Sequence, residues 1–110
     1  MISLIEQSKP ALAELCRRFN VNRLFVFGSG VNGRFDPHTS DLDFVVELDD
    51  RQPTKSYADR YLGFAEALER LFGRRVDLLT EQSIRNPYLR HEVQSTRELV
   101  YEQGSEETPV

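Results

Sequence analysis

Apolar positions recur along the chain with two different periods, and each period predicts a different kind of element. Between residues 8 and 19 they recur every three or four positions, which predicts a helix. Ser8 is its expected cap, and Pro10 is expected in its first turn. Residues 23–27 are apolar on both faces, as in an interior strand of a covered sheet. Residues 42–48 form the second predicted strand.

The second half of the chain continues the alternation of helix and strand. An apolar stripe of helical period predicts a helix over residues 56–72, with Ser56 as its cap. Gly73 stands where a helix often ends on a left-handed residue. Residues 75–80 predict a third strand, and the pair Asn86-Pro87 predicts the start of a third helix that runs toward residue 93.

The order of these elements indicates the fold class. Helix, strand, strand, helix, strand and helix predict an α/β (α+β) fold in which a small mixed β-sheet is flanked by helices. Residues 99–101 read only as a short apolar end piece. We expect a single domain over residues 1–103 and a polar tail over residues 104–110.

The composition limits the class of protein further. The chain has 110 residues, 39% of them hydrophobic, which indicates a soluble folded domain. Its formal net charge of −4 argues against direct nucleic-acid binding, and its apolar runs are too short for a membrane span. Cys16 is the one cysteine, so no internal disulfide can form. A cytoplasmic, reducing location is expected.

The candidate chemistry lies mainly between residues 28 and 43. Gly28-Ser29 ends the first predicted strand, and Asp41 and Asp43 open the next, with both carboxylates on one face. Asp77, within the apolar third strand, supplies a third carboxylate. Paired carboxylates and substrate phosphates commonly hold Mg²⁺, and a Gly-Ser turn offers backbone N–H groups and a hydroxyl to phosphate. The pattern favours a phosphate-binding metal site, with two Mg²⁺ ions expected.

Two other interpretations of these residues compete with a metal site. The glycines from Gly28 to Gly33 match a dinucleotide fingerprint, but too few residues follow them before the next strand for the helix that this fingerprint requires. A purely structural interpretation has Asp41 capping a turn and Asp43 pairing with Arg75. That interpretation leaves Asp77 without a reason to lie in an apolar strand.

The same residues carry a resemblance to a known family. Gly28-Ser29, eleven intervening residues, Asp41-Leu42-Asp43 and a later Asp77 resemble the nucleotidyltransferase superfamily related to DNA polymerase beta. More narrowly, the chain is similar to the minimal (MNT-type) members. The resemblance implies Mg²⁺-dependent transfer of a nucleoside monophosphate, most simply AMP from ATP, to a hydroxyl. Asp41, Asp43 and Asp77 would be the catalytic metal ligands, and Gly28 and Ser29 would hold the triphosphate.

The resemblance also implies a partner. Minimal members often act as antitoxins beside a HEPN-type ribonuclease toxin, and some AMPylate that toxin, so a hetero-oligomer with such a protein is expected. Relatives commonly carry Arg at the two positions that Gly30 and Asn32 fill here, and Arg34 is the displaced candidate for phosphate binding. The alternative is therefore a nucleotidyltransferase-fold binding module that neutralises its partner by occlusion.

Overall fold

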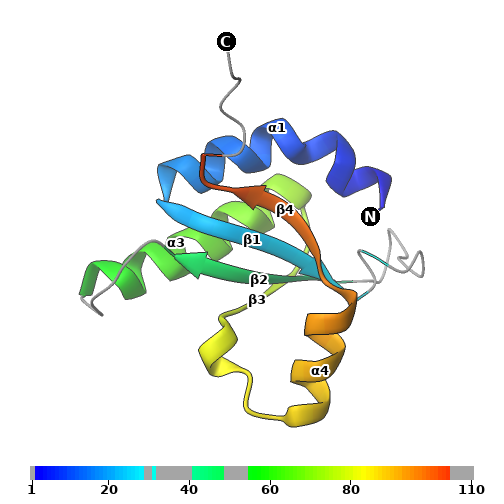
Figure 1. Cartoon of the computed structure of the whole chain (residues 1–110). Helices are drawn as coiled ribbons and strands as arrows, with labels where there is room; N and C mark the ends of the chain where they lie inside the picture. The colour runs from blue at the N-terminus through cyan, green and yellow to red at the C-terminus, as the bar shows by residue number, and fades with distance from the viewer. Residues whose placement is uncertain (1, 29–30, 32–40, 49–54, 105–110) are drawn as a thin grey trace.

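A four-stranded mixed sheet forms the centre of the molecule (Figure 1). The computed structural model describes residues 2–28, 31, 41–48 and 55–104. The strands are β1 (Val21–Phe27), β2 (Leu42–Leu48), β3 (Val76–Leu79) and β4 (Glu98–Glu102), in the order β3-β2-β1-β4. β1 pairs antiparallel with β2 and β4, and β2 pairs parallel with β3. The predicted α/β class with a small mixed sheet is confirmed.

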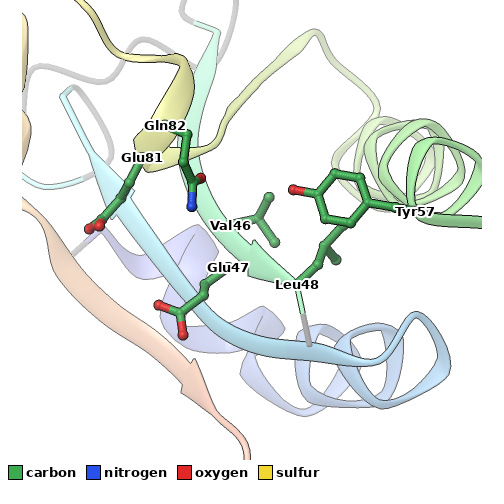
Figure 2. A pocket seen from close by; sticks show the side chains of 6 residues that line it. All are labelled: Val46, Glu47, Leu48, Tyr57, Glu81 and Gln82. Atoms are coloured by element: carbon green, nitrogen blue, oxygen red, sulfur yellow. The ribbon is translucent and has the colours of Figure 1, made fainter. Parts of the chain in front are cut away.

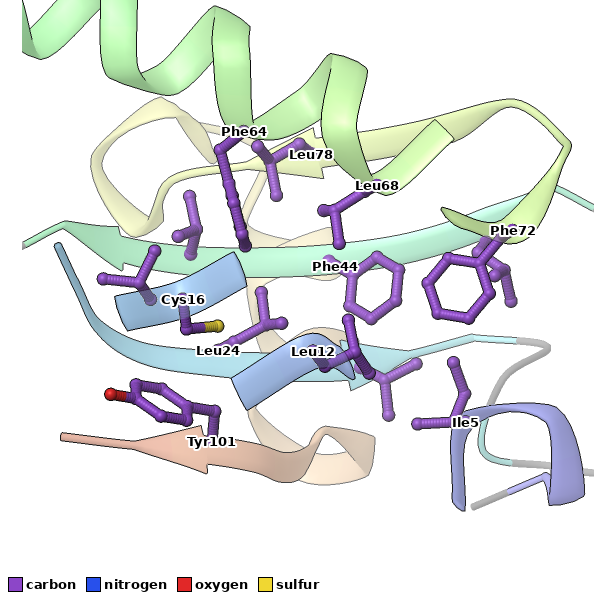
Figure 3. Close-up of a cluster of buried hydrophobic side chains, with 14 of the residues drawn as sticks. Ile5, Leu12, Cys16, Leu24, Phe44, Phe64, Leu68, Phe72, Leu78 and Tyr101 are labelled. Atoms are coloured by element: carbon purple, nitrogen blue, oxygen red, sulfur yellow. The ribbon is translucent and has the colours of Figure 1, made fainter. Parts of the chain in front are cut away.

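Helices cover both faces of this sheet. On one face, α1 (Ser3–Arg18) and α3 (Lys55–Phe72) enclose the larger core (Figures 1 and 3). On the other face, α4 (Pro87–Thr96) and the short helix η1 (Glu81–Ser83) flank a smaller apolar cluster. Alternate residues of β1 and β2 enter the two clusters because strand side chains alternate between faces. Burial on both sides explains why the strands read as continuous apolar runs.

The first helix begins five residues earlier than its periodicity predicted. α1 starts at Ser3, so Pro10 lies inside the helix, and the predictions of a Ser8 cap and a first-turn proline were wrong. The extra turn buries Ile5 completely in the larger core (Figure 3). An interior proline forfeits a backbone hydrogen bond and strains the preceding turn. We attribute the tolerance of Pro10 to the apolar burial that the added turn supplies.

The last strand was not predicted as a strand. Residues 99–101, predicted as an apolar end piece, lie within β4. This strand pairs with β1 on the side opposite β2, and Tyr101 is buried there. The short helix η1 was also missed. α3 begins at Lys55, so Ser56 lies within the helix instead of capping it. Asn86 does cap α4, since its side chain accepts hydrogen bonds from the Tyr88 and Leu89 amides.

The structure also locates the cysteine and describes the character of the helices. Cys16 is fully buried in the larger core and packs as a small apolar residue (Figure 3). Within the described part of the chain, none of the helices combines the length and hydropathy that crossing a membrane requires.

Candidate active site

Two carboxylates face each other across the parallel pair β2–β3. The register places Asp43 of β2 opposite Asp77 of β3. Burial raises the pKa of Asp43 to about 6, and the nearby charge of Asp77 and a hydrogen bond with it add to this effect. Weaker contributions come from Asp41 and then Glu92 of α4. This carboxyl therefore lies among other acids, and its charged form is disfavoured.

Gly28 lies directly against this carboxylate at the end of β1. A Cβ atom on Gly28 would stand 2.8 Å from Oδ2 of Asp43. Its φ of +67° is also in the left-handed region that favours glycine. The backbone can approach Asp43 this closely only because residue 28 has no side chain. Gly28 and Asp43, which end and open successive strands, are thus in close approach in the structure.

The three predicted aspartates are not equally placed. Asp43 and Asp77 lie opposite each other, whereas Asp41 immediately precedes β2 and lies near enough for its charge to affect Asp43. Among the described residues, no three His, Cys, Asp or Glu side chains lie close enough together to form a metal-holding group. The structure thus brings two of the three predicted ligands together and leaves Asp41 beside them. Ser29 and Arg34, the other predicted phosphate ligands, lie outside the described residues, as do Gly30 and Asn32.

A cavity of about 390 Å³ opens at the carboxylate pair. It is lined by Phe27, Asp43, Tyr61, Ala65, Val76, Asp77, Leu78, Leu79 and Leu89. The lining combines two carboxylates and one phenol with apolar side chains, a mixture that is usual for small-molecule sites. Tyr61 of α3 and Leu89 of α4 were not predicted here, because the helical stripe assigns Tyr61 to the core and an exposed leucine gives no signal in sequence.

A smaller pocket of about 120 Å³ lies toward the other end of β2 (Figure 2). It is lined by Val46, Glu47, Leu48, Tyr57, Glu81 and Gln82. Both acids there are neutralised by the chain itself, since Glu47 pairs with Arg23 and Glu81 with Arg97. Because these carboxylates already have cationic partners, we place the candidate active site at Asp43 and Asp77.

The chemistry of the donors suits a hard divalent cation. Asp43 and Asp77 offer oxygen atoms only, and their mutual repulsion would be relieved by a cation bound between them. The lack of a side chain on Gly28 lets the backbone lie directly beside these oxygen atoms. The residues present therefore fit Mg²⁺ carried with a nucleotide.

Comparison with known proteins identifies the family. Residues 9–100 match the family model described as nucleotidyltransferase domain, so the chain belongs to this family and is a nucleotidyltransferase. A protein of Methanocaldococcus jannaschii named "Putative protein adenylyltransferase MJ1379" is 34% identical over 84 residues, which cover 76% of this chain and 79% of the relative.

Solved structures agree with this assignment. The structure described as a "putative minimal nucleotidyltransferase" is 31% identical, covers 88% of this chain and 95% of its own, and has a TM-score of 0.64. Two toxin–antitoxin structures share the fold at 19% identity. One, with AMP-PNP, has a TM-score of 0.64 over 87% of this chain and 74% of its own. The other, a tri-AMPylated Shewanella oneidensis HEPN toxin in complex with MNT antitoxin, has a TM-score of 0.55 and covers 89% of this chain and 72% of its own.

Proposed function

We propose that this nucleotidyltransferase is a Mg²⁺-dependent protein adenylyltransferase that moves AMP from ATP onto a hydroxyl of a protein partner. The observation that carries the proposal is the pair Asp43–Asp77, which lines the larger cavity and whose Asp43 lies against Gly28. The relative named as a protein adenylyltransferase supports the same activity. We further propose that the partner is a HEPN-type toxin, that the two form a hetero-oligomer, and that the pair acts in the cytoplasm.

In this proposal the residues of the site divide into those that bind the metal and those that bind the triphosphate. Asp41, Asp43 and Asp77 would hold the metal, with Asp77 also accepting the proton of the acceptor hydroxyl. Gly28, Ser29 and Arg34 would bind the triphosphate, the first two through backbone N–H groups and the serine hydroxyl. When bound, Mg²⁺ neutralises the phosphate charges and lowers the pKa of an attacking hydroxyl. The apolar side chains of the cavity would lie beside the acceptor.

The reaction balances without any further co-reactant. A bond forms between the acceptor oxygen and the α-phosphorus of ATP, and the bond from that phosphorus to the bridging oxygen of the β-phosphate breaks. Pyrophosphate leaves, and the proton of the acceptor hydroxyl passes to the carboxylate side of the site. The protein residue gains an adenylyl group, and no oxidation or reduction takes place.

The test uses the chain with the protein encoded beside it. The pair is incubated with Mg²⁺ and α-labelled ATP, and labelled protein is followed by mass spectrometry. We expect one or more adenylyl groups on the partner and none with an Asp41→Asn/Asp43→Asn double variant. An unlabelled partner with every nucleoside triphosphate would exclude the proposed transfer.

The second candidate is neutralisation by occlusion, without chemistry. It is favoured by Gly30 and Asn32, which stand at the two positions where the family resemblance leads us to expect arginine. Co-expression with the partner separates the two functions. If the double aspartate variant still neutralises the partner fully, occlusion is sufficient, whereas loss of neutralisation supports transfer.

A further inference from the structure

The strand that carries Asp77 is the least supported strand of the sheet. β3 has four residues and, among the strands that the structure describes, pairs with β2 alone, because it stands at the edge of the order β3-β2-β1-β4. Asp77, near the middle of β3, lies opposite Asp43 of β2, and the two carboxylate charges repel each other. When both carboxyls are ionised, this repulsion acts against the pairing of β3 with β2, so a contact on the outer edge of β3 would add to the hold that the ladder provides.

The backbone pattern shows which groups of β3 face outward. The amide of Leu42 donates to the carbonyl of Arg75, which fixes the start of the parallel ladder. Because backbone groups along a strand face alternate sides, residues 75, 77 and 79 turn theirs toward β2. Val76 and Leu78, which flank Asp77, therefore turn theirs toward the open edge.

Two side chains of α3 bind those two outward groups. The hydroxyl of Tyr61 donates to the carbonyl of Leu78, and the carboxylate of Glu69 accepts from the amide of Val76 at 3.2 Å. α3 and β3 run in opposite directions across a short connection, so the earlier helix residue meets the later strand residue. Burial, with a smaller contribution from Tyr57, raises the pKa of Tyr61, so its hydroxyl stays protonated and can donate.

We propose that Tyr61 and Glu69 are positioning residues that hold β3 from its outer edge and so keep Asp77 opposite Asp43. They act on the site through the backbone on either side of Asp77. The strand-holding role stands on the geometry of the chain alone, and only its catalytic consequence rests on the proposed function. Tyr61 also lines the larger cavity, so its ring keeps a packing role even when the hydroxyl is removed.

Hydrogen exchange of the metal-free protein tests the proposal without catalysis. Tyr61→Phe removes the hydroxyl and keeps the ring, and Glu69→Ala removes the second contact at an exposed site. We expect the amides of residues 77 and 79 to exchange about 3–10-fold faster in each variant, as the loss of one hydrogen bond implies. The amide of Val26 in the central strand β1 should keep its rate.

Matched controls lie on the same helix. Tyr57→Phe removes a hydroxyl one turn earlier, from a residue that lines the smaller pocket (Figure 2), and Glu66→Ala removes an exposed acid. Neither should change exchange in β3. Unchanged exchange of residues 77 and 79 in both test variants would overturn the proposal. An equal increase at Val26 would also overturn it, because the loss would then be global.

A binding and a kinetic measurement extend the test to the site. Titration of the metal-free variants with Mg²⁺ alone should give an apparent affinity about threefold or more below that of the two controls. In the transfer assay, kcat should fall with little change in KM for ATP, because the triphosphate ligands are untouched. Normal Mg²⁺ affinity in both variants would contradict the positioning role. An inactive wild-type protein would instead exclude the proposed transfer and leave the exchange result as the deciding measurement.

Discussion

The two ends of β2 carry acidic side chains on the same face of the sheet in opposite electrostatic surroundings. Glu47 accepts hydrogen bonds from Arg23 at 2.7 Å and from Asn22 at 2.5 Å. Burial alone would raise the pKa of Glu47, but these bonds and the charge of Arg23 outweigh it and hold the pKa below its usual value. At the other end the pKa of Asp43 is raised to about 6 by burial and by the acids around it.

Under the proposed function, this difference separates Glu47, an acid that supports the fold, from Asp43, an acid that binds a ligand. Arg23 of the same chain forms an ion pair with Glu47, so the charge of Glu47 is compensated as soon as the protein folds. Among the described residues, the charges that raise the pKa of Asp43 are those of Asp77, Asp41 and Glu92, all of them acidic. Under the proposed function, a cation bound with the substrate would neutralise Asp43 and so couple nucleotide binding to the relief of repulsion.

The largest effect is expected when Asp43 becomes Asn. This change removes a proposed metal ligand, so nucleotidyl transfer should fall by about 10²-fold or more. It also removes the like-charge repulsion with Asp77, so the metal-free protein should unfold at an equal or higher temperature. Thermal unfolding and the labelled transfer assay measure both quantities. A less stable variant that remained active would contradict the assignment of Asp43 to the active site.

The second prediction concerns the backbone beside Asp43. Gly28→Ala should lower the free energy of unfolding by about 2 kcal/mol, because a Cβ would strain a left-handed residue and meet the Asp43 carboxylate. Activity should fall with it. Gly73→Ala is the matched control, since φ there is +62° but nothing lies within 4 Å of the added Cβ. It should cost only about 1 kcal/mol in chemical denaturation and leave activity intact. Equal losses in the two variants would show that contact with Asp43 is unimportant.

These predictions concern residues that the sequence located with unequal success. The bounds of β2 were predicted correctly as 42–48, because an apolar run between polar segments is a local signal. Asp43 and Asp77 were proposed as site residues, but their direct opposition follows from a parallel register across α3, which no local pattern encodes. A strand at the edge, such as β4, also gave too weak a signal to be recognised.

The contacts of side chains with distant backbone were the least predictable. Tyr61 reads as one member of the apolar stripe of α3, and the burial of its ring agrees with that. Its hydroxyl, however, binds a carbonyl that lies seventeen residues further along the chain. The prediction of where α1 starts was wrong for a related reason, because the burial of Ile5 in the core becomes visible only in the packed structure. Periodicity reports which side chains are apolar, whereas these contacts depend on tertiary packing.

The third prediction uses pH to compare the wild-type chain with Asp43→Asn. The folded pKa of Asp43 lies above the unfolded value, so between about pH 4 and pH 6 the folded protein keeps a proton that the unfolded chain releases. Stability should therefore fall as pH rises through this window. We expect the free energy of unfolding to fall by about 1 kcal/mol across this window, after allowance for solvent screening of a half-buried group. Urea unfolding without metal should show this decline in the wild type relative to the variant, and identical pH profiles would contradict it.

The smallest effect is expected at the opposite end of β2. Glu47→Gln keeps the shape of the side chain but removes the charge that Arg23 and Asn22 recognise. The pair is partly exposed, so the loss should be only about 0.5–1 kcal/mol, and it should shrink further in high salt. Glu47→Gln should thus lower the stability of the metal-free protein, whereas Asp43→Asn should leave it equal or higher. Transfer activity and Mg²⁺ affinity of Glu47→Gln should stay at wild-type levels. If Glu47→Gln instead weakened Mg²⁺ binding as strongly as Asp43→Asn, the two ends of β2 would belong to one site and the distinction between them would be lost.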